Sequence, residues 1–168
     1  MIINRVWSMP NKNTFSIKPI KELIWKYREG LEIVIDPFAN SNKIANITND
    51  LDTQYDTDYH MDALDFLKQF EDKSVDMVLF DPPYSPRQVS ESYKKLGMSV
   101  NMQTTQASYW SNMKNEISRI IKSDGYAISF AWNSGGIGKT KGFQIEEILL
   151  VPHGGWHNDT IVTVEKKV

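Results

Sequence analysis

The stretch Val75-Asp76-Met77-Val78-Leu79-Phe80-Asp81-Pro82-Pro83-Tyr84 decides the fold. Its first six residues are mostly apolar and predict a buried strand. Two prolines then end the strand, because proline has no backbone N–H and fixes φ. Asp81 is therefore expected at the carboxyl end of the strand, which is where open α/β sheets bind ligands.

The turn that follows the strand offers three groups to an aromatic amine. The carboxylate of Asp81 can accept a hydrogen bond from an exocyclic NH₂ group. The carbonyl of Pro82 can accept the second N–H, because Pro83 has no N–H of its own to compete for it. Tyr84 offers a flat face on which a base can stack. The turn thus suits chemistry on the amino group of a nucleobase.

Asp-Pro-Pro-Tyr after an apolar strand resembles the catalytic motif of the S-adenosylmethionine-dependent amino-methyltransferases, chiefly the adenine-specific (N6) DNA methyltransferases. The resemblance implies a Rossmann-like domain that binds S-adenosylmethionine and methylates an adenine flipped out of DNA, by direct in-line transfer. It implies that the catalytic residues are Asp81, Pro82, Pro83 and Tyr84. By motif, the resemblance covers roughly residues 14 to 84.

Two segments resemble the parts of this family that hold the methionine end of the cofactor. In the first, Thr14-Phe15-Ser16-Ile17-Lys18-Pro19-Ile20, the resemblance implies contacts from Phe15, Ile17 and Pro19; an ordinary helix start explains it equally well. The second is similar to the family's Asp-Pro-Phe-Ala-Gly-Ser-Gly loop and implies contacts from Asp36, Pro37, Phe38, Ala39 and Asn40. Asn40 and Asn42 replace the two glycines. Asparagine tolerates positive φ better than most residues, so the turn is expected to survive.

Two further acidic residues are candidates for hydrogen bonds to the adenosine part of the cofactor. Asp50, in Asn49-Asp50-Leu51-Asp52, lies at the end of the second expected strand, where a carboxylate can accept from both ribose hydroxyls. The resemblance favours Asp50 over Asp52. Asp62, followed by Ala63, resembles the residue that accepts from the adenine amino group, although a simple N-cap explains it equally. Asp50 comes only fourteen residues after Asp36, so the first crossover helix is expected to be shortened.

The alternation of strands and helices predicts an α/β fold. We expect a mostly parallel sheet with an antiparallel C-terminal edge, in a single catalytic domain over residues 1–168 without a separate target-recognition domain. The expected strands are 31–35, 45–51, 55–60, 75–80, 126–132, 144–151 and 160–165. The expected helices are 17–27, 62–70 and 109–121, with a long polar loop over 86–103.

Substrate contacts are expected in the segment that follows the motif. It interleaves basic and aromatic residues, a pattern that suits nucleic acid as well as it suits a solvated loop. The candidates are Tyr84, Arg87, Tyr93, Lys94 and Lys95. No metal site is expected, since His153, His157 and Asp159 fall in a Gly-rich turn and not on a helix. The run 134–140 lacks the spacing of a phosphate loop and is interpreted as a flexible loop.

The amino-acid composition excludes one reaction and bears on the expected partners. The absence of cysteine excludes methylation at cytosine carbon, which needs a thiol nucleophile, and fits a cytoplasmic protein. No transmembrane run or signal peptide is visible, so no membrane partner is expected. A net charge of −2 predicts weak DNA binding by the chain alone. A homodimer or a partner that supplies specificity could enlarge the contact.

Three alternatives remain from the sequence. RNA, or the amino group of cytosine, could be the acceptor for the same chemistry, although cytosine-amino enzymes of this kind usually carry Ser in place of Asp81. A non-catalytic nucleic-acid-binding or regulatory module could have lost the cofactor, as the missing glycines suggest. A small-molecule or protein methyltransferase is the third.

Overall fold

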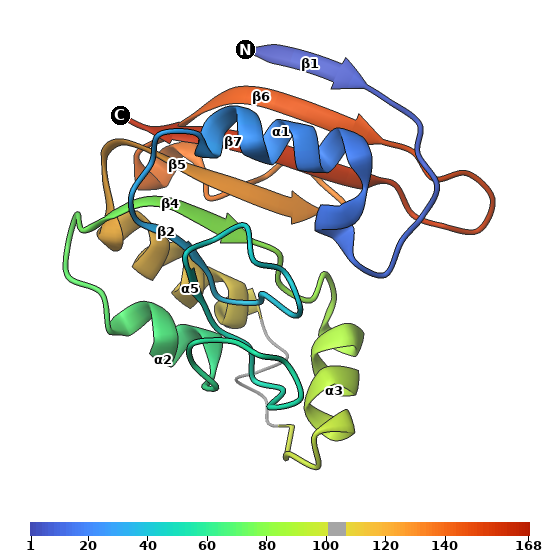
Figure 1. Ribbon diagram of the computed structural model, residues 1–168, viewed down its shortest axis with the longest axis vertical. Coiled ribbons are helices and arrows are strands. Elements are labelled where there is room, and N and C mark those ends of the chain that lie inside the picture. Colours follow the sequence, from blue (N-terminus) through green and yellow to red (C-terminus); the bar gives the residue numbers. More distant parts are fainter. Residues whose placement is uncertain (101–106) are drawn as a thin grey trace.

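The computed structural model describes residues 1–100 and 107–168, which form one mixed sheet with helices on both faces (Figure 1). The strands are β1 (Ile2–Arg5), β2 (Val34–Asp36), β3 (Ile47–Thr48), β4 (Val75–Phe80), β5 (Ile121–Ala131), β6 (Phe143–Val151) and β7 (Thr160–Lys167). The α-helices are α1 (Lys18–Arg28), α2 (Ala63–Lys68), α3 (Pro86–Lys95) and α5 (Ala107–Ile120). Short 3₁₀ turns cover η1 (Thr14–Ser16) and η2 (Lys139–Lys141).

The sheet confirms the predicted α/β class. Its described part has seven strands in the order β1-β6-β7-β5-β4-β2-β3. All neighbouring strands are parallel except β7, which runs antiparallel to both β5 and β6. Residues 37–46, between the parallel strands β2 and β3, contain turns and no helix, so the first crossover is shortened as predicted. The carboxyl ends of β1, β2, β3, β4, β5 and β6 consequently meet at one edge of the sheet.

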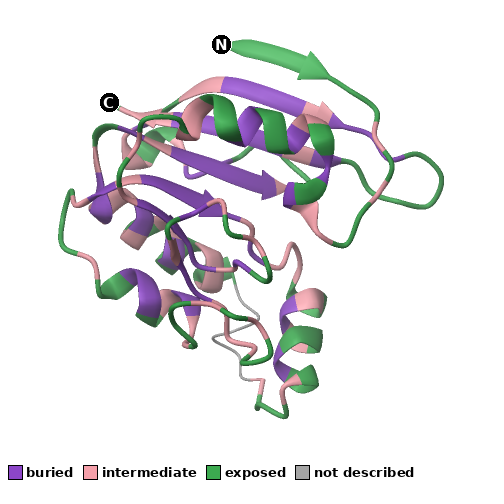
Figure 2. Ribbon diagram, in the orientation of Figure 1, coloured by how far each residue is buried: buried purple, intermediate pink, exposed green. Residues whose placement is uncertain are grey.

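Each face of the sheet is covered by helices with an apolar stripe (Figure 2). On one face, Ile20, Leu23 and Ile24 of α1 are buried at helical spacing and pack in a cluster that includes Met77 and Leu79 of β4. Pro19 lies in the first turn of α1, where its missing N–H costs no hydrogen bond. On the other face, α2 and α5 bury a second cluster around Phe66, Met113, Ile117, Val78 and Phe80. The strand that carries the motif is therefore packed on both sides.

One segment differs from its prediction. Residues 86–95 form the helix α3 and not a polar loop, while 101–103 of the expected loop lie outside the described residues. The Ser85 side chain caps the helix by accepting from the Gln88 N–H, and Pro86 occupies the first turn. Val89 and Tyr93, four residues apart, are its buried contacts.

Other boundaries also move. β1 was not expected, and its four residues are all exposed. The strand expected at 55–60 is reduced to an isolated bridge between Asn49 and Tyr59. Within the described residues, none of the helices has the length and apolarity that a membrane crossing requires.

Glu147 of β6 connects three elements of the fold. Its buried carboxylate accepts from Lys26 Nζ at 2.6 Å and from the Tyr27 hydroxyl at 2.8 Å, both on α1. It also accepts from Asn4 Nδ2 of β1 at 3.2 Å. Burial alone would raise the pKa of Glu147, but these hydrogen bonds outweigh it and hold the pKa below its usual value.

We expect Glu147→Gln to lower the free energy of unfolding at pH 7 by about 1–3 kcal/mol, because it removes the charge that these donors stabilise. The depressed pKa makes this contribution present at neutral pH and lost as the pH falls through the acidic range. Urea unfolding at pH 7 measures the loss. Glu146→Gln, on the same strand and with no described hydrogen-bond partner, is the control; equal losses in both variants would contradict the assignment.

Candidate active site

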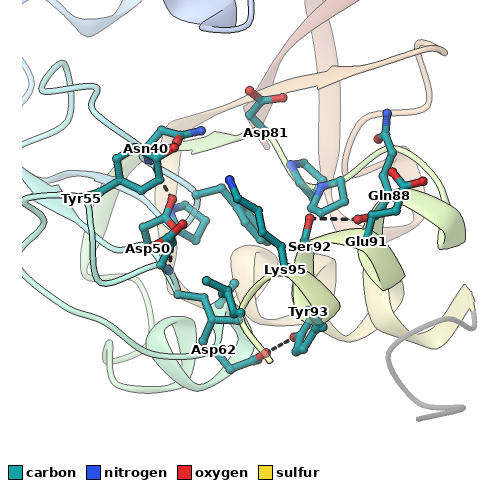
Figure 3. Close-up of a pocket in the computed structure, with 18 of the residues that line it drawn as sticks. Asn40, Asp50, Tyr55, Asp62, Asp81, Gln88, Glu91, Ser92, Tyr93 and Lys95 are labelled. Atoms are coloured by element: carbon teal, nitrogen blue, oxygen red, sulfur yellow. Dashed lines mark hydrogen bonds between the residues drawn. The ribbon is translucent and has the colours of Figure 1, made fainter. Parts of the chain in front are cut away.

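A cavity of about 540 Å³ lies at the carboxyl edge of the sheet, where β2, β3 and β4 end. The loops after these strands form one side, and α3 forms the opposite side (Figure 3). Its size falls within the range of small-molecule and cofactor sites.

The turn after β4 is held by hydrogen bonds to its backbone and side chains. The Tyr84 hydroxyl donates to Asp81 Oδ1 at 2.7 Å, and the Tyr84 N–H donates to Gln88 Oε1 at 2.7 Å. Trp110 Nε1 of α5 donates to the Pro83 carbonyl at 2.9 Å. No donor to the Pro82 carbonyl is present among the described residues. The Pro82 carbonyl therefore remains as an acceptor for a bound amine, beside the Asp81 carboxylate, whose two oxygens together carry more lone pairs than these donors use.

The electrostatic environment of Asp81 is unusual for a carboxyl group. Burial raises its pKa to about 6, although hydrogen bonds from the Tyr84 and Thr14 side chains oppose the rise. The carboxyl group therefore changes charge close to neutral pH. Perturbed carboxyl groups in a cavity are characteristic of functional sites.

The loop after β2 keeps the tight turn that its missing glycines put in question. Asn40 has φ 54°, so an asparagine adopts the left-handed conformation that a glycine would favour. Its N–H donates to Asp50 Oδ2 at 2.9 Å. Asp36 Oδ1 accepts from the Phe38 N–H at 3.0 Å. Burial raises the pKa of Asp36 well above its usual value, and the nearby Asp81 and Asp50 raise it further.

Asn49, which the sequence did not single out, links the loop after β2 to the far end of its own loop, which leads from β3 to α2. Its Nδ2 donates to the carbonyls of Pro37 at 3.1 Å and Met61 at 3.0 Å, and its Oδ1 accepts from the Met61 N–H at 3.1 Å. The side chain is fully buried. The sequence indicates only the neighbouring acids Asp50 and Asp52 as candidates. A buried amide side chain at a strand end is nevertheless well suited to join loops through hydrogen bonds.

Asp50 and Asp62 face the same cavity but differ in their partners. Asp50 accepts from two backbone N–H groups, of Asn40 and Asp52, which leaves lone pairs on both oxygens. Asp62 caps α2 by accepting from the Leu64 N–H, and its other oxygen accepts from the Tyr93 hydroxyl (Figure 3). Asp50 is thus the freer acceptor of the two.

The structure brings most of the predicted residues to the cavity and places the rest elsewhere. Those that line it are Pro37, Phe38, Asn40, Asp50, Asp62, Ala63, Asp81, Pro82, Pro83, Tyr84, Tyr93 and Lys95. Asp36 and Ala39 are buried in the adjacent loop. Phe15 and Ile17 are core residues, the Phe15 ring lying 4.7 Å from that of Phe130, and only Thr14 of their segment reaches the cavity.

The expected substrate contacts on α3 divide in the same way. Arg87 is exposed and pairs with Glu91 at 2.8 Å, and Lys94 is also exposed. Tyr93 and Lys95 instead face the cavity, and Lys95 extends into it (Figure 3). The sequence did not indicate that Lys12, Tyr55 and Gln88 also line it. Ser85-Pro86, a typical helix start, was the available signal for α3 and hence for Gln88.

A second cavity of about 230 Å³ shares Pro82 and Tyr84 with the first. Trp110, Lys114 and Ser129 are among its other lining residues. Within the described part of the chain, the buried Ser129 hydroxyl has no hydrogen-bond partner. Pro82 and Tyr84 therefore lie between two separate spaces.

The histidine-containing turn has a structural role in the described residues. His153 is buried, and its ring nitrogens lie 2.9 Å from the Ser8 carbonyl and 2.8 Å from Thr160 Oγ1. Across residues 1–100 and 107–168, no group of three or more His, Cys, Asp or Glu side chains is arranged to hold a metal ion.

Comparison with known proteins identifies the fold. No family model and no curated protein matches the sequence. Among solved structures, TrmN from Thermus thermophilus superposes with a TM-score of 0.60 at 16% identity over 90% of this chain, which spans only 49% of that structure's length. An S-adenosylmethionine-dependent methyltransferase from Archaeoglobus fulgidus gives 0.61 at 11% identity, covering 89% of this chain and 92% of that one.

A third match carries a ligand. The 1,6-didemethyltoxoflavin-N1-methyltransferase of Burkholderia thailandensis, whose structure contains S-adenosylhomocysteine, gives a TM-score of 0.60 at 9% identity, covering 94% of this chain and 80% of that one. At such low identities these likenesses establish the fold. The chain has the Rossmann-like fold of the methyltransferases.

Asn40 allows a direct test of the loop. Asn40→Val should lower the free energy of unfolding by about 1–2 kcal/mol, because a β-branched residue is disfavoured at positive φ. Asn40→Gly should preserve or raise stability, since glycine adopts this conformation freely. Thermal unfolding of the two variants measures both effects. Equal melting temperatures for Asn40→Val and Asn40→Gly would contradict the left-handed turn.

Proposed function

We propose that this chain transfers the methyl group of S-adenosylmethionine to the N6 amino group of adenine in DNA. The observation that carries the proposal is the arrangement at the end of β4. There the successive residues Asp81 and Pro82 line the cavity and supply a carboxylate and a carbonyl as acceptors, and Tyr84 holds the Asp81 carboxylate in place. Two acceptors side by side match the two N–H groups of an exocyclic amine.

The residues around the cavity fit the proposed cofactor. S-adenosylmethionine carries a positive sulfonium and ammonium group. Asp50 and Asp81 line the cavity and Asp36 is buried beside it, and all three have raised pKa values. A bound cation favours the ionised form of nearby acids and relieves their mutual repulsion. Asp50 has oxygen lone pairs left for ribose hydroxyls. The left-handed turn at Asn40 directs a backbone N–H to Asp50 and so orients that acceptor.

The chain's residues would act mainly by positioning. S-adenosylmethionine supplies an electrophilic methyl carbon when bound. Asp81 and the Pro82 carbonyl would accept the two N–H bonds of the amine, which turns the nitrogen lone pair toward that carbon. The Asp81 carboxylate would also stabilise the positive charge that develops on nitrogen and lies ready to take the proton that nitrogen loses. Stacking on Tyr84 would hold the flipped base.

Adenine is preferred over cytosine because Asp81, and not Ser, begins the motif in this chain. RNA with the same amino group is the alternative acceptor, and the assay must include it. We expect DNA binding by the isolated chain to be micromolar or weaker and steeply salt-dependent, given its net charge of −2.

Cofactor binding is the first expected outcome. In titration calorimetry the chain should bind S-adenosylmethionine and S-adenosylhomocysteine, and Asp50→Ala should weaken binding by about 1.5–3 kcal/mol through loss of a charged acceptor. Asp36→Ala should weaken it as well. Asp56→Ala, an exposed acid outside the cavity lining, serves as the control. The absence of heat at millimolar ligand would favour the regulatory alternative.

Methyl transfer depends next on Asp81. Asp81→Ala and Asp81→Asn should each lower the rate by about 10²–10³-fold, because the charge that stabilises developing positive charge is lost. Tritiated methyl transfer to unmethylated DNA, and to RNA in parallel, measures the rate; mass analysis identifies the methylated nucleoside. Full activity in Asp81→Ala would refute the mechanism. Methyladenosine from RNA alone would correct the substrate and keep the mechanism.

The pH profile tests the bond between Asp81 and Tyr84. At S-adenosylmethionine concentrations well below saturation, the rate should rise with pH through about 6 and then level off, since only the ionised Asp81 is expected to be active. Tyr84→Phe removes a hydrogen bond that lowers the pKa of Asp81, so its midpoint should shift to higher pH. Above that midpoint the variant should keep much of its activity, because the stacking face remains. An unshifted midpoint would show that the hydroxyl does not control Asp81.

A further inference from the structure

The two halves of the carboxyl edge differ in character. The loop from residue 49 to 62, after β3, contains five aspartates and no Lys or Arg. The segments after β1, β5 and β6, at 6–13, 132–138 and 152–159, together contain Asp159 as their only acid. These three segments carry three tryptophans, Trp7, Trp132 and Trp156. We call these three side chains the aromatic edge.

All three tryptophans of the aromatic edge are exposed. Trp156 is fully exposed, Trp7 is 57% exposed and Trp132 is 43% exposed. Exposed apolar side chains mark an interaction surface when they lie close together on one part of a protein. Trp25, on α1, is 45% exposed but lies outside these segments.

The sheet order brings these distant parts of the sequence together. The segment after β1 runs beside the β6–β7 hairpin, since the Ser8 N–H donates to the Pro152 carbonyl at 3.2 Å. Trp7 Nε1 lies 3.5 Å from the position that a Cβ at Gly154 would occupy. On the other side of the hairpin, β5 pairs with β7 and leads into Trp132. Figure 1 shows the hairpin and the segment after β1 at the same end of the sheet.

Trp132 connects the aromatic edge to the candidate active site. Its ring meets that of Tyr84 edge to face, with centroids 5.6 Å apart. β1 and β4 lie at the two ends of this part of the sheet, separated by β6, β7 and β5. At the usual strand spacing, the row from Trp7 to Tyr84 extends over roughly 20 Å.

We propose that the aromatic edge binds an unpaired stretch of nucleic acid and leads one of its bases to Tyr84. Exposed aromatic faces bind bases by stacking, which tolerates any sequence and requires that the bases be unpaired. Arg5, just before the first segment, and Lys12, within it, can contact phosphates, whereas the five-aspartate loop repels phosphates. The half of the edge that carries the five-aspartate loop instead favours a cationic ligand. The inference rests on the proposed function only in taking Tyr84 as the place that receives the acceptor base.

Fluorescence anisotropy of a labelled twelve-residue oligothymidylate tests the proposal with the whole chain. Thymine has no exocyclic amine, so binding is independent of methyl transfer. Trp156→Ala should weaken binding by roughly five- to a hundredfold, the usual effect of one stacked base, and Trp156→Phe should restore most of it. Trp7→Ala should also weaken binding. Trp25→Ala should bind like the wild type, and a hairpin duplex should compete poorly.

Equal affinities for Trp156→Ala and the wild type would overturn the proposal, as would an equal loss in Trp25→Ala. Two other occupants would overturn it as well. Trp156-dependent binding to anionic lipid vesicles without oligothymidylate binding would assign the edge to a membrane surface, and Trp156-dependent self-association in sedimentation would assign it to a second copy. Tryptophan-dependent oligothymidylate binding without methyl transfer to any nucleic acid would uphold the inference and reject the proposed function.

Discussion

Burial of acidic side chains at the ends of neighbouring parallel strands is the constraint on which the site depends. Asp36 ends β2, Asp81 follows β4, and the two strands are paired in the sheet, so the two carboxyl groups are forced into proximity. Burial and mutual repulsion raise the pKa of Asp36, and burial raises that of Asp81. Buried carboxyl groups that lie close together are difficult to ionise, and a positively charged ligand favours their ionised form. The proposed cofactor has that charge.

The remaining structure holds these acids in place and separates them from the acceptor side. The buried amide of Asn49 links the loops that carry Asp36 and Asp50. Tyr84 holds Asp81 and also lines the second cavity. Along the same edge of the sheet, acidic residues lie after β2 and β3, and exposed tryptophans lie after β5, β6 and β1. A cationic cofactor and an anionic substrate could approach Asp81 from opposite directions.

Local sequence signals predicted part of this arrangement. The strand before Asp81, the short crossover before Asp50 and the positive φ of Asn40 each follow from spacing or residue type within a few positions. The sequence of α3 predicts a loop because it is mostly polar, and in the structure only Val89 and Tyr93 of its ten residues are buried. The grouping of Trp7, Trp132 and Trp156 follows from strand order, which a single sequence does not reveal. Asn49 was missed because its role lies in contacts with backbone groups of other loops.

The central claim is that Asp36 and Asp81 become ionised when a cationic cofactor binds. The number of protons released on cofactor binding tests it most directly. Calorimetric titrations at pH 6, in two buffers with different ionisation enthalpies, count these protons. S-adenosylmethionine should release more protons than S-adenosylhomocysteine, because only the former carries a sulfonium that favours ionised Asp36 and Asp81. The Asp81→Asn variant should reduce the difference. Equal proton release for the two ligands would contradict the account.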